Sequence, residues 1–404
     1  MTDKTRIDDL AVFGGTPAFE SPLPVGQLYL PDWTDFERLF RGIFARRYFT
    51  NHGPLVRELD ERIAAYLGVR HATNVTNGTV ALMIALRALD LRGEVIVPSF
   101  TFPATVQAIS WAGLTPVFCD VDPATHMLTA ENVRKLIGPR TSGVLGVHLW
   151  GRACDPDALQ KLCLENNLRL LFDAAHAFSC TWNGHRIGGL GDVECFSLHA
   201  TKLLSAMEGG CLTTNDDGLA ARIRTIRNFH VSESFVQVSL RINGKMTEAQ
   251  AGMALLSLDM LPAVLERNQC VFDIYSRHAQ TWCGLRLLEA PLGETWNHQY
   301  CVLEVDARLA GLERDELLEV LRSEGVLARR YFYPGLHRLP PYFARPEHGN
   351  VLPVTDELCK TVMQLPLGAR VSARDAERVG RLLGFVLEHG TEIRKRLQQR
   401  GAQS

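Results

Sequence analysis

Short apolar runs alternate with helix-like stretches between residues 95 and 172, and this alternation limits the possible folds more than any other feature of the sequence. The apolar runs predict buried strands at 95–97, 116–119, 144–148 and 170–172. The stretches 104–112 and 155–166 between them have helical patterns. A βαβα order predicts an α/β fold in which helices cover both faces of a mostly parallel sheet. Such sheets bind ligands at the carboxyl ends of their strands, so polar residues that follow the strands are candidates for a site.

Further elements are expected on either side of this core. Leu82, Ala85, Leu86 and Leu89 repeat at the spacing of one helix face, which predicts a helix over 79–89. The other expected elements are a helix at 55–67, strands at 193–196, 211–212 and 300–305, a long helix through 262–270, and helices at 313–323 and 376–387. The charged tail, residues 392–404, is expected to fray.

The chain of 404 residues is long enough for two domains of ordinary size. The alternation stops near 262–270, which suggests a change of domain there. We expect a lead-in segment over residues 1–53, a large α/β domain over 54–265 and a smaller C-terminal α+β domain over 266–404.

The overall charge sets limits on the partners of the chain. A formal net charge of −2, with 22% charged and 46% hydrophobic residues, is ordinary for a globular enzyme and provides no field that would attract nucleic acid. The sequence has no run of about 18 apolar residues and no apolar stretch like that of a signal peptide. The ten cysteines form no Cys-x-x-Cys pair, which argues against zinc and against a disulfide framework. We expect a cytoplasmic protein with buried, reduced thiols, no metal and no membrane partner.

Polar or aromatic residues occupy several of the positions at which strands end. Asn77-Gly78-Thr79 begins a predicted helix, where backbone N–H groups suit a phosphate, although such helix starts are common. Phe102 follows the strand at 95–97 and could cover a planar ring, although a core position is the commoner role of a phenylalanine. Asp173 follows the strand at 170–172 and needs a cationic partner, which could be an arginine, a helix start or a protonated pyridine nitrogen.

Lys202 lies in a turn between two apolar runs, after Ser197 and before Glu208. Most lysines are surface residues, but a lysine held among apolar neighbours loses hydration, so its pKa falls and its neutral amine can form a Schiff base with a carbonyl. A phosphate-binding turn, an aromatic ring, an aspartate and a lysine in this order are what pyridoxal phosphate chemistry requires. The lysine tethers the aldehyde, and the aspartate keeps the ring nitrogen protonated.

The chain resembles the DegT/DnrJ-type aminotransferases, the sugar-nucleotide branch of the fold type I pyridoxal phosphate enzymes, over nearly its whole length. The motifs that carry the resemblance are TNHGP at 50–54, TNGT at 76–79, VPSFTF at 97–102, PVFCDVDP at 116–123, DAAH at 173–176, SLHATK at 197–202, EGG at 208–210, NGKMTE at 243–248 and YPGLH at 333–337. The resemblance implies a seven-stranded, mostly parallel sheet between helices and a smaller C-terminal domain.

The resemblance also implies roles around pyridoxal 5′-phosphate, which would become pyridoxamine 5′-phosphate during turnover. Lys202 would form the internal aldimine and then move the proton between Cα and C4′. Asp173 would pair with the pyridine nitrogen, and His176 would contact the ring or its 3-oxygen. Phe102 would stack on the ring. The residues implied to bind the phosphate are Gly78, Thr79, Ser197 and, from the neighbouring subunit, Asn243.

A residue that reaches the neighbouring site implies an obligate homodimer with shared active sites. On the substrate side the resemblance points to Glu208, Lys245, Tyr331 and His337. Many relatives have Asn-Tyr-Arg-Met where this chain has Asn-Gly-Lys-Met at 243–246. The change from arginine to lysine removes a bidentate contact to an anion.

The implied reaction is ping-pong transfer of an amino group from L-glutamate to a keto sugar nucleotide. The motifs are most similar to those of enzymes that act at C4 of 4-keto-6-deoxy sugars, which points to a dTDP-4-keto-6-deoxyhexose. Other amines remain possible products, namely a 3-amino sugar, an aminocyclitol or an aromatic amine. A related sugar dehydratase would carry histidine in place of Lys202, and a non-catalytic relative would be expected to lose Asp173 or Lys202.

Overall fold

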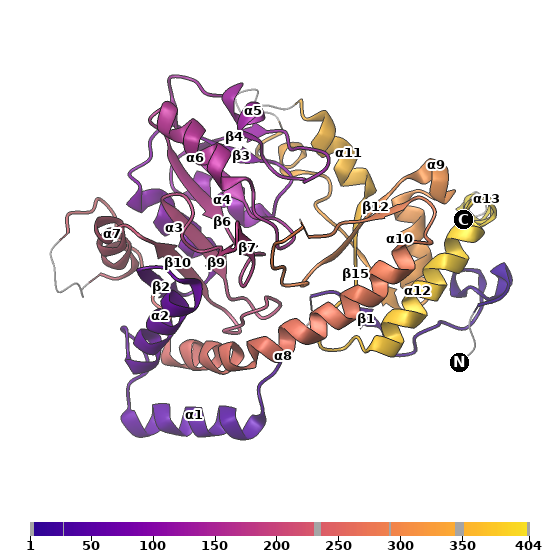
Figure 1. The fold of residues 1–404 in the computed structure, drawn as a ribbon, viewed down its shortest axis with the longest axis horizontal. Coiled ribbons are helices and arrows are strands. Elements are labelled where there is room, and N and C mark those ends of the chain that lie inside the picture. The colour runs from indigo at the N-terminus through magenta and orange to yellow at the C-terminus, as the bar shows by residue number, and fades with distance from the viewer. Residues whose placement is uncertain (1–3, 27, 230–235, 291, 344–350, 402–404) are drawn as a thin grey trace.

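The computed structural model describes residues 4–26, 28–229, 236–290, 292–343 and 351–401. A large body built on one sheet and a smaller body that contains the C-terminus are joined by the long helix α8 (Figure 1).

The large body is built on a seven-stranded sheet. Its strands, in spatial order, are β2 (His71–Val75), β10 (Gly210–Thr214), β9 (Val193–Ser197), β6 (Arg169–Asp173), β5 (Thr141–Val147), β3 (Glu94–Pro98) and β4 (Thr115–Cys119). Only β10 runs antiparallel to its neighbours, and all the other pairs in this sheet are parallel. The expected α/β class and mostly parallel sheet are therefore confirmed.

Both faces of this sheet are buried. Successive residues of a strand point to opposite faces, so each strand contributes side chains to the core on both sides. On β10, Cys211 belongs to a core cluster with α2 and α8, whereas Leu212 belongs to a second cluster with α3, α4 and α6. The helices around the sheet are α2 (Pro54–Leu67), α3 (Gly78–Ala88), α4 (Pro103–Trp111), α5 (Ala130–Arg134), α6 (Pro156–Glu165) and α7 (Asp217–Arg227).

The helix starts follow local sequence signals. Proline occupies the first turn of α2, α4 and α6, where its missing N–H costs no hydrogen bond. The Asn77 side chain caps α3 by accepting a hydrogen bond of 2.9 Å from the backbone N–H of Val80. These signals explain why the expected bounds of these four helices lie within one residue of the observed ones.

Helix α8 (Glu248–Ala279) has 32 residues and confirms the long helix expected through 262–270. It begins with a capping box in which Thr247 and Gln250 satisfy each other's backbone N–H groups. The expected domain boundary at 265/266 falls inside this continuous helix and stays a prediction.

The smaller body confirms the expected C-terminal α+β region. Its antiparallel sheet consists of β11 (Leu285–Leu287), β12 (Cys301–Val305), β15 (Val362–Leu365) and β14 (Arg329–Arg330). Its helices are α9 (Ala307–Ala310), α10 (Arg314–Ser323), α11 (Pro353–Thr361) and α12 (Ala373–Glu388). Two short strands, β7 (Thr181–Trp182) and β8 (His185–Arg186), lie between β6 and β9 in the sequence. The other short elements, β13 (Val326–Leu327) and η3 (Leu336–Arg338), follow α10.

The N-terminal segment packs mainly on this smaller body. It contains η1 (Ile7–Asp9), η2 (Ala11–Phe13), β1 (Leu23–Pro24) and α1 (Trp33–Arg46). Strand β1 pairs in parallel with β13, and Leu10 and Phe19 are buried in the same cluster as the C-terminal helices. Helix α1 instead packs along α8.

The expectation of a frayed tail was wrong, because residues 390–401 form helix α13 (Gly390–Gly401). Ile393 and Leu397 lie one turn apart and are buried in the core of the smaller body. Arg396 forms ion pairs with Asp8 and Glu392. Residues 402–404 of the expected tail lie outside the described residues.

All ten cysteines lie within the described residues and are free thiols. Eight of them are buried, but the expectation of burial was wrong for Cys270 and Cys283, which are exposed. In the part of the chain that the structure describes, no helix is both long enough and apolar enough to cross a bilayer.

Candidate active site

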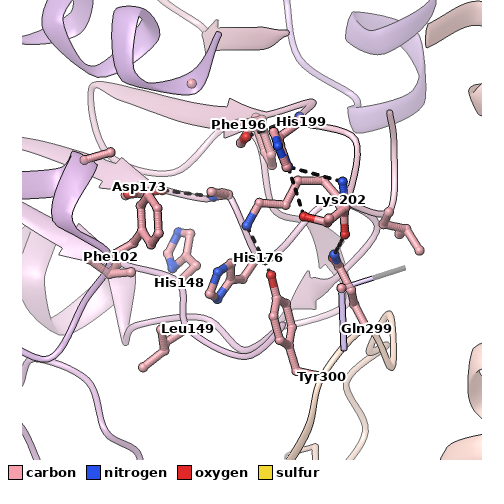
Figure 2. Close-up of a pocket in the computed structure, with 18 of the residues that line it drawn as sticks. Phe102, His148, Leu149, Asp173, His176, Phe196, His199, Lys202, Gln299 and Tyr300 are labelled. Carbon is pink, nitrogen blue, oxygen red and sulfur yellow. Dashed lines mark hydrogen bonds between the residues drawn. The ribbon is translucent and has the colours of Figure 1, made fainter. Parts of the chain in front are cut away.

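A cavity of about 670 Å³ opens at the carboxyl ends of the parallel strands. Its wall combines residues of the large body with residues of the smaller body, including Gln299, Tyr300 and Arg329. Nine of the residues singled out from the sequence line it: Gly78, Thr79, Phe102, Asp173, His176, Ser197, Lys202, Glu208 and Tyr331. Figure 2 shows the labelled side chains of Phe102, Asp173, His176, Lys202 and Tyr300 around this space.

The start of α3 forms one end of the cavity. Its position depends on glycines: a Cβ on Gly78 would lie 3.0 Å from Cβ of Ser197, and a Cβ on Gly210 would lie 2.5 Å from the backbone of Asn77. The two glycines therefore let the first turn of α3 approach the ends of β9 and β10 closely. Backbone N–H groups at this helix start suit an anion.

Asp173 ends β6 and is 7% exposed. Its carboxylate accepts hydrogen bonds from Thr105 Oγ1 at 2.7 Å and from the backbone N–H of Ala175 at 3.0 Å. Among the described residues, no lysine or arginine forms an ion pair with it. A buried carboxylate in this situation is suited to a cationic group in the cavity.

Lys202 lies in the turn after β9, where its backbone N–H donates to the carbonyl of His199 at 2.8 Å. Its Nζ donates to the Tyr300 hydroxyl at 3.1 Å (Figure 2). Burial lowers the pKa of Lys202 to about 8, although nearby Asp173 opposes this shift. Near neutral pH a usable fraction of the amine is therefore uncharged.

The His176 ring lies between two aromatic rings. Its centroid is 4.2 Å from that of Tyr300 and 5.7 Å from that of Trp150. Burial, assisted by the charge of Lys202, holds the pKa of His176 well below its usual value, so the ring is neutral. Its Nδ1 is buried and has no hydrogen-bond partner among the described residues.

These features fit a planar, phosphorylated pyridine. The carboxylate of Asp173 can receive a protonated ring nitrogen, and the start of α3 can receive a phosphate. The orphaned Nδ1 of His176 is a polar atom that a ring substituent could satisfy. Phe102 is 57% exposed and stands at the cavity, where its ring face is accessible.

Three residues expected at the site do not line the cavity. His337 is buried between Ser99 Oγ, 2.7 Å from its Nδ1, and Asp356 Oδ1, 3.0 Å from its Nε2. Lys245 and Asn243 lie beside the Thr76 backbone, and Lys245 Nζ donates to Asn243 Oδ1 at 2.5 Å. The Asn243 side chain is exposed to solvent in the single chain.

Several cavity residues were missed by the sequence reasoning. Tyr300 precedes β12 and Arg329 lies on β14, so both reach the cavity from the smaller body. Gln299 Nε2 donates to the Thr201 carbonyl at 2.8 Å and so holds the lysine turn (Figure 2). His148 follows β5 and pairs with buried Glu194 at 2.8 Å. Only His148 had a signal, because it ends a predicted strand.

The seven-stranded sheet, with a buried lysine and an aspartate at the carboxyl ends of its strands, defines the class of fold type I pyridoxal phosphate enzymes. A family model, described as the DegT/DnrJ/EryC1/StrS aminotransferase family, matches residues 34–383. The chain belongs to this aminotransferase family.

Three similar proteins span nearly all of the chain. A dTDP-4-amino-4,6-dideoxy-D-glucose transaminase of Shigella dysenteriae is 32% identical over 88% of this chain and 96% of its own length. A UDP-N-acetyl-3-dehydro-α-D-glucosamine 3-aminotransferase of Acidithiobacillus ferrooxidans is 32% identical over 83% of this chain and 89% of its own length. DesI, in a crystal structure in the presence of its TDP-sugar product, has a sequence that is 43% identical to this chain. The two structures match with a TM-score of 0.93, and the match covers 97% of this chain and 100% of that one.

Proposed function

We propose that the protein transfers an amino group from L-glutamate to the keto group of a nucleotide-linked sugar, with a dTDP-4-keto-6-deoxyhexose aminated at C4 as the first choice. The observation that carries the proposal is the buried amine of Lys202 in one cavity with the buried carboxylate of Asp173. The nucleotide sugar is supported by the names of the transaminase of Shigella dysenteriae and of DesI with its TDP-sugar product. The choice of L-glutamate as the amino donor rests on the family resemblance.

The residues of the cavity can hold pyridoxal 5′-phosphate, which supplies an electron sink for proton removal next to a nitrogen. Asp173 would hold a proton on the ring nitrogen, and Thr105 fixes the carboxylate for that task. Phe102 would cover one ring face, and His176 would contact the ring or its 3-oxygen. The first turn of α3 at Gly78 and Thr79, with the Ser197 hydroxyl, would bind the phosphate.

Lys202 would tether the cofactor and then move the proton in both half-reactions. A buried amine with a pKa near 8 can accept a proton at neutral pH and release it again, which an ordinary lysine does poorly. Tyr300 is within hydrogen-bond distance of Nζ and can orient the amine between these two tasks.

Substrate residues are proposed at the mouth of the cavity. Glu208 and Tyr331 line it, and Glu208 lies 3.7 Å from Nε2 of His199. Asn243 is proposed to reach the phosphate in a second copy of the chain, with Lys245 beside it, so that a homodimer shares its two sites. The exposed position of Asn243 in the single chain is consistent with this role.

A second candidate is amination at C3. The relative of Acidithiobacillus ferrooxidans, named for a 3-amino transfer, has the same 32% identity as the 4-amino relative, so overall identity does not decide the carbon. A dehydratase is disfavoured, because Lys202 would re-form the link to the cofactor.

The proposal is tested by absorbance spectra of the purified protein with L-glutamate, for the wild type and Lys202→Ala. We expect a cofactor band near about 400–430 nm in the wild type, which glutamate shifts to shorter wavelength. Lys202→Ala should lose this conversion. Incubation of the glutamate-treated enzyme with dTDP-4-keto and 3-keto sugars then identifies the product by mass. Wild-type protein that shows no band after reconstitution with the cofactor would overturn the proposal.

A further inference from the structure

Trp150 lies behind the wall of the cavity, where the two bodies meet. It is fully buried, and its ring packs against two rings that line the cavity: that of His176 from the large body and that of Tyr300 from the smaller body, each with centroids 5.7 Å away. Two further rings of the smaller body, Tyr331 and Phe332, lie at 5.6 and 5.4 Å. One indole therefore supports cavity residues of both bodies.

The backbone of Trp150 is in an unfavourable conformation. Its φ of 59° lies in the left-handed region, which a bulky residue rarely adopts. The next residue, Gly151, has a φ of 84°, and a Cβ there would lie 2.2 Å from Nε1 of Trp296. That Nε1–H donates a hydrogen bond to the carbonyl of Trp150. A conformation of this kind persists only where the surrounding structure fixes it, and such residues cluster at functional sites.

The indole N–H of Trp150 also determines where a buried histidine carries its proton. Its Nε1 lies 3.2 Å from Nδ1 of His126, which is 1% exposed. An indole N–H can only donate, so Nδ1 is the acceptor and the ring carries its proton on Nε2, 2.6 Å from Oε1 of Glu304. Burial lowers the pKa of His126, and Glu304 only partly opposes this shift. The charges of Arg152 and Arg286 act with burial, so the ring stays neutral.

The hydrogen bond between His126 and Glu304 joins the two bodies beside the cavity. His126 lies between β4 and α5 of the large body, whereas Glu304 lies on β12 of the smaller body, where Arg286 of β11 also pairs with it. Strand β12 begins directly after Tyr300, whose hydroxyl is 3.1 Å from Nζ of Lys202 (Figure 2). His126 therefore holds both the indole behind Tyr300 and the strand that follows Tyr300.

We infer that His126 is a positioning residue for Lys202 and acts through Trp150. The hydrogen bond from the indole to His126 keeps the ring of Trp150 packed against Tyr300 and His176, and these two rings exclude water from the amine. Neither His126 nor Trp150 lines the cavity, so each acts through the residues in front of it. The inference deepens the proposed function and rests on the role given there to Lys202.

The consequence to measure is the hydration of Nζ of Lys202. The titratable groups that face this amine are Asp173, His176 and Tyr300. Burial lowers the pKa of Lys202 to about 8, so a looser wall that admits water should move this pKa back toward its ordinary value of 10.5. His126→Leu removes the acceptor of the indole N–H and should loosen the wall. A rise of one unit makes the amine about tenfold less reactive at neutral pH.

The test is competitive acetylation of the full chain with acetic anhydride over a range of pH, after any bound cofactor has been removed. Only the neutral amine reacts, so mass spectrometry of the peptide that contains Lys202 gives the pH at which half of this amine is neutral. We expect this midpoint near about pH 8 for the wild type and about one unit higher for His126→Leu.

His126→Asn should keep the wild-type midpoint. The amide oxygen of an asparagine takes the place of Nδ1 as acceptor, although the contact with Glu304 is lost in this variant as it is in His126→Leu. Asparagine also tolerates the φ of 65° at this position. The two variants therefore separate the hydrogen bond to the indole from the general effect of removing a buried histidine.

The matched control is His278→Leu on α8. It removes another histidine–glutamate pair, in which Nε2 lies 2.8 Å from Oε2 of Glu377 outside the cavity, and it should leave the midpoint unchanged. A midpoint for His126→Leu equal to that of the wild type would overturn the inference. An equal rise in His126→Asn or in the control would also overturn it, because the effect would then be general loosening of the structure.

A second variant covers the case in which His126→Leu does not fold, as judged by circular dichroism. Trp150→Phe removes the indole donor and keeps an aromatic ring, so the midpoint should rise in the same direction, and an unchanged midpoint would contradict the role of Trp150. Absorbance spectra of the same preparations with L-glutamate report separately on the proposed reaction. A wild type with a midpoint near about pH 8 that does not convert the cofactor contradicts the proposed function alone. Conversion together with an unmoved midpoint in His126→Leu contradicts only the inference.

Discussion

At the scale of single residues, the site depends on the competition between burial and charge at Lys202. Loss of hydration favours the neutral amine, while the carboxylate of Asp173 favours the ammonium form. Burial is the larger effect, so the pKa falls to about 8. The amine is therefore reactive near neutral pH and still able to carry a proton.

The first prediction concerns the pH dependence of cofactor uptake. Only the neutral amine attacks the aldehyde of pyridoxal 5′-phosphate, so uptake by cofactor-free protein should rise with pH and level off above about pH 8. Well below that pH the rate should fall about tenfold per unit. Stopped-flow absorbance measures this profile. The ordinary pKa of a lysine is 10.5. A rate that still rises as the pH approaches this value would show that burial does not shift the pKa of Lys202.

The second prediction concerns the support of Asp173. Asp173→Asn should slow the glutamate half-reaction by about 100- to 10,000-fold, because the amide cannot hold the ring nitrogen protonated. Thr105→Val removes a hydrogen bond to the carboxylate. The free-energy barrier of the glutamate half-reaction should rise by about 1.5–3 kcal/mol, which slows this half-reaction roughly 10- to 100-fold. The control in single-turnover kinetics is Ser110→Ala. Ser110 lies on the same helix, but its hydroxyl is hydrogen-bonded to Tyr342 and not to Asp173.

At the scale of elements, α13 shows that a highly charged segment can be an ordered helix. Ile393 and Leu397 face the core, while Arg394 and Arg396 extend to Glu313 and Asp8. The two apolar side chains are too few to give a clear periodicity, and their burial becomes possible only when the smaller body provides a surface for them.

The third prediction tests this anchoring. Ile393→Ala should destabilise the C-terminal body by about 2–5 kcal/mol, because it removes a fully buried side chain and leaves a cavity. Lys395→Ala, which changes an exposed residue of the same helix, should stay within about 0.5 kcal/mol of the wild type. Urea unfolding measures the free energy of unfolding of both variants, and hydrogen exchange measures the stability of α13 itself. Equal effects of the two variants would contradict the docking of this helix.

At the scale of the whole molecule, the two ends of the chain pack together on the smaller body. The buried carboxylate of Glu324, at the end of α10, accepts from the backbone N–H groups of Ala11 and Ala18, each at 2.7 Å. It also forms an ion pair of 3.0 Å with Lys4. The N-terminal segment is therefore part of the structural support of the domain that supplies Tyr300 and Arg329 to the cavity.

The fourth prediction follows from this contact. Glu324→Gln should destabilise the protein by about 1–3 kcal/mol, since an amide has one acceptor atom and cannot satisfy both N–H groups and the lysine. Glu319→Gln, at an exposed position of the same helix, should have little effect. The midpoint of thermal unfolding compares them. An unchanged midpoint for Glu324→Gln would show that the N-terminal segment contributes little to stability.

The sequence by itself determined the class of fold and most of the wall of the site. Strand–helix alternation, proline at helix starts and the asparagine cap of α3 are local signals, so most of the core elements could be placed from the sequence within three residues, although β2 and α7 were not expected. Asp173, Ser197 and Lys202 could be identified because residues that follow parallel strands meet at one edge of the sheet. The motifs around them then pointed to a specific cofactor.

Only the tertiary structure decided which distant residues complete the site and which candidates stay outside it. Tyr300 contacts Lys202 across 98 positions of the sequence, and His337 is buried between Ser99 and Asp356 away from the cavity. The order of α13 and the pairing of β1 with β13 also depend on surfaces that exist only after folding. The physical reason is the same in each case: the contacts join groups that are far apart in the sequence and meet only when the chain has folded, so no local pattern of residues predicts them.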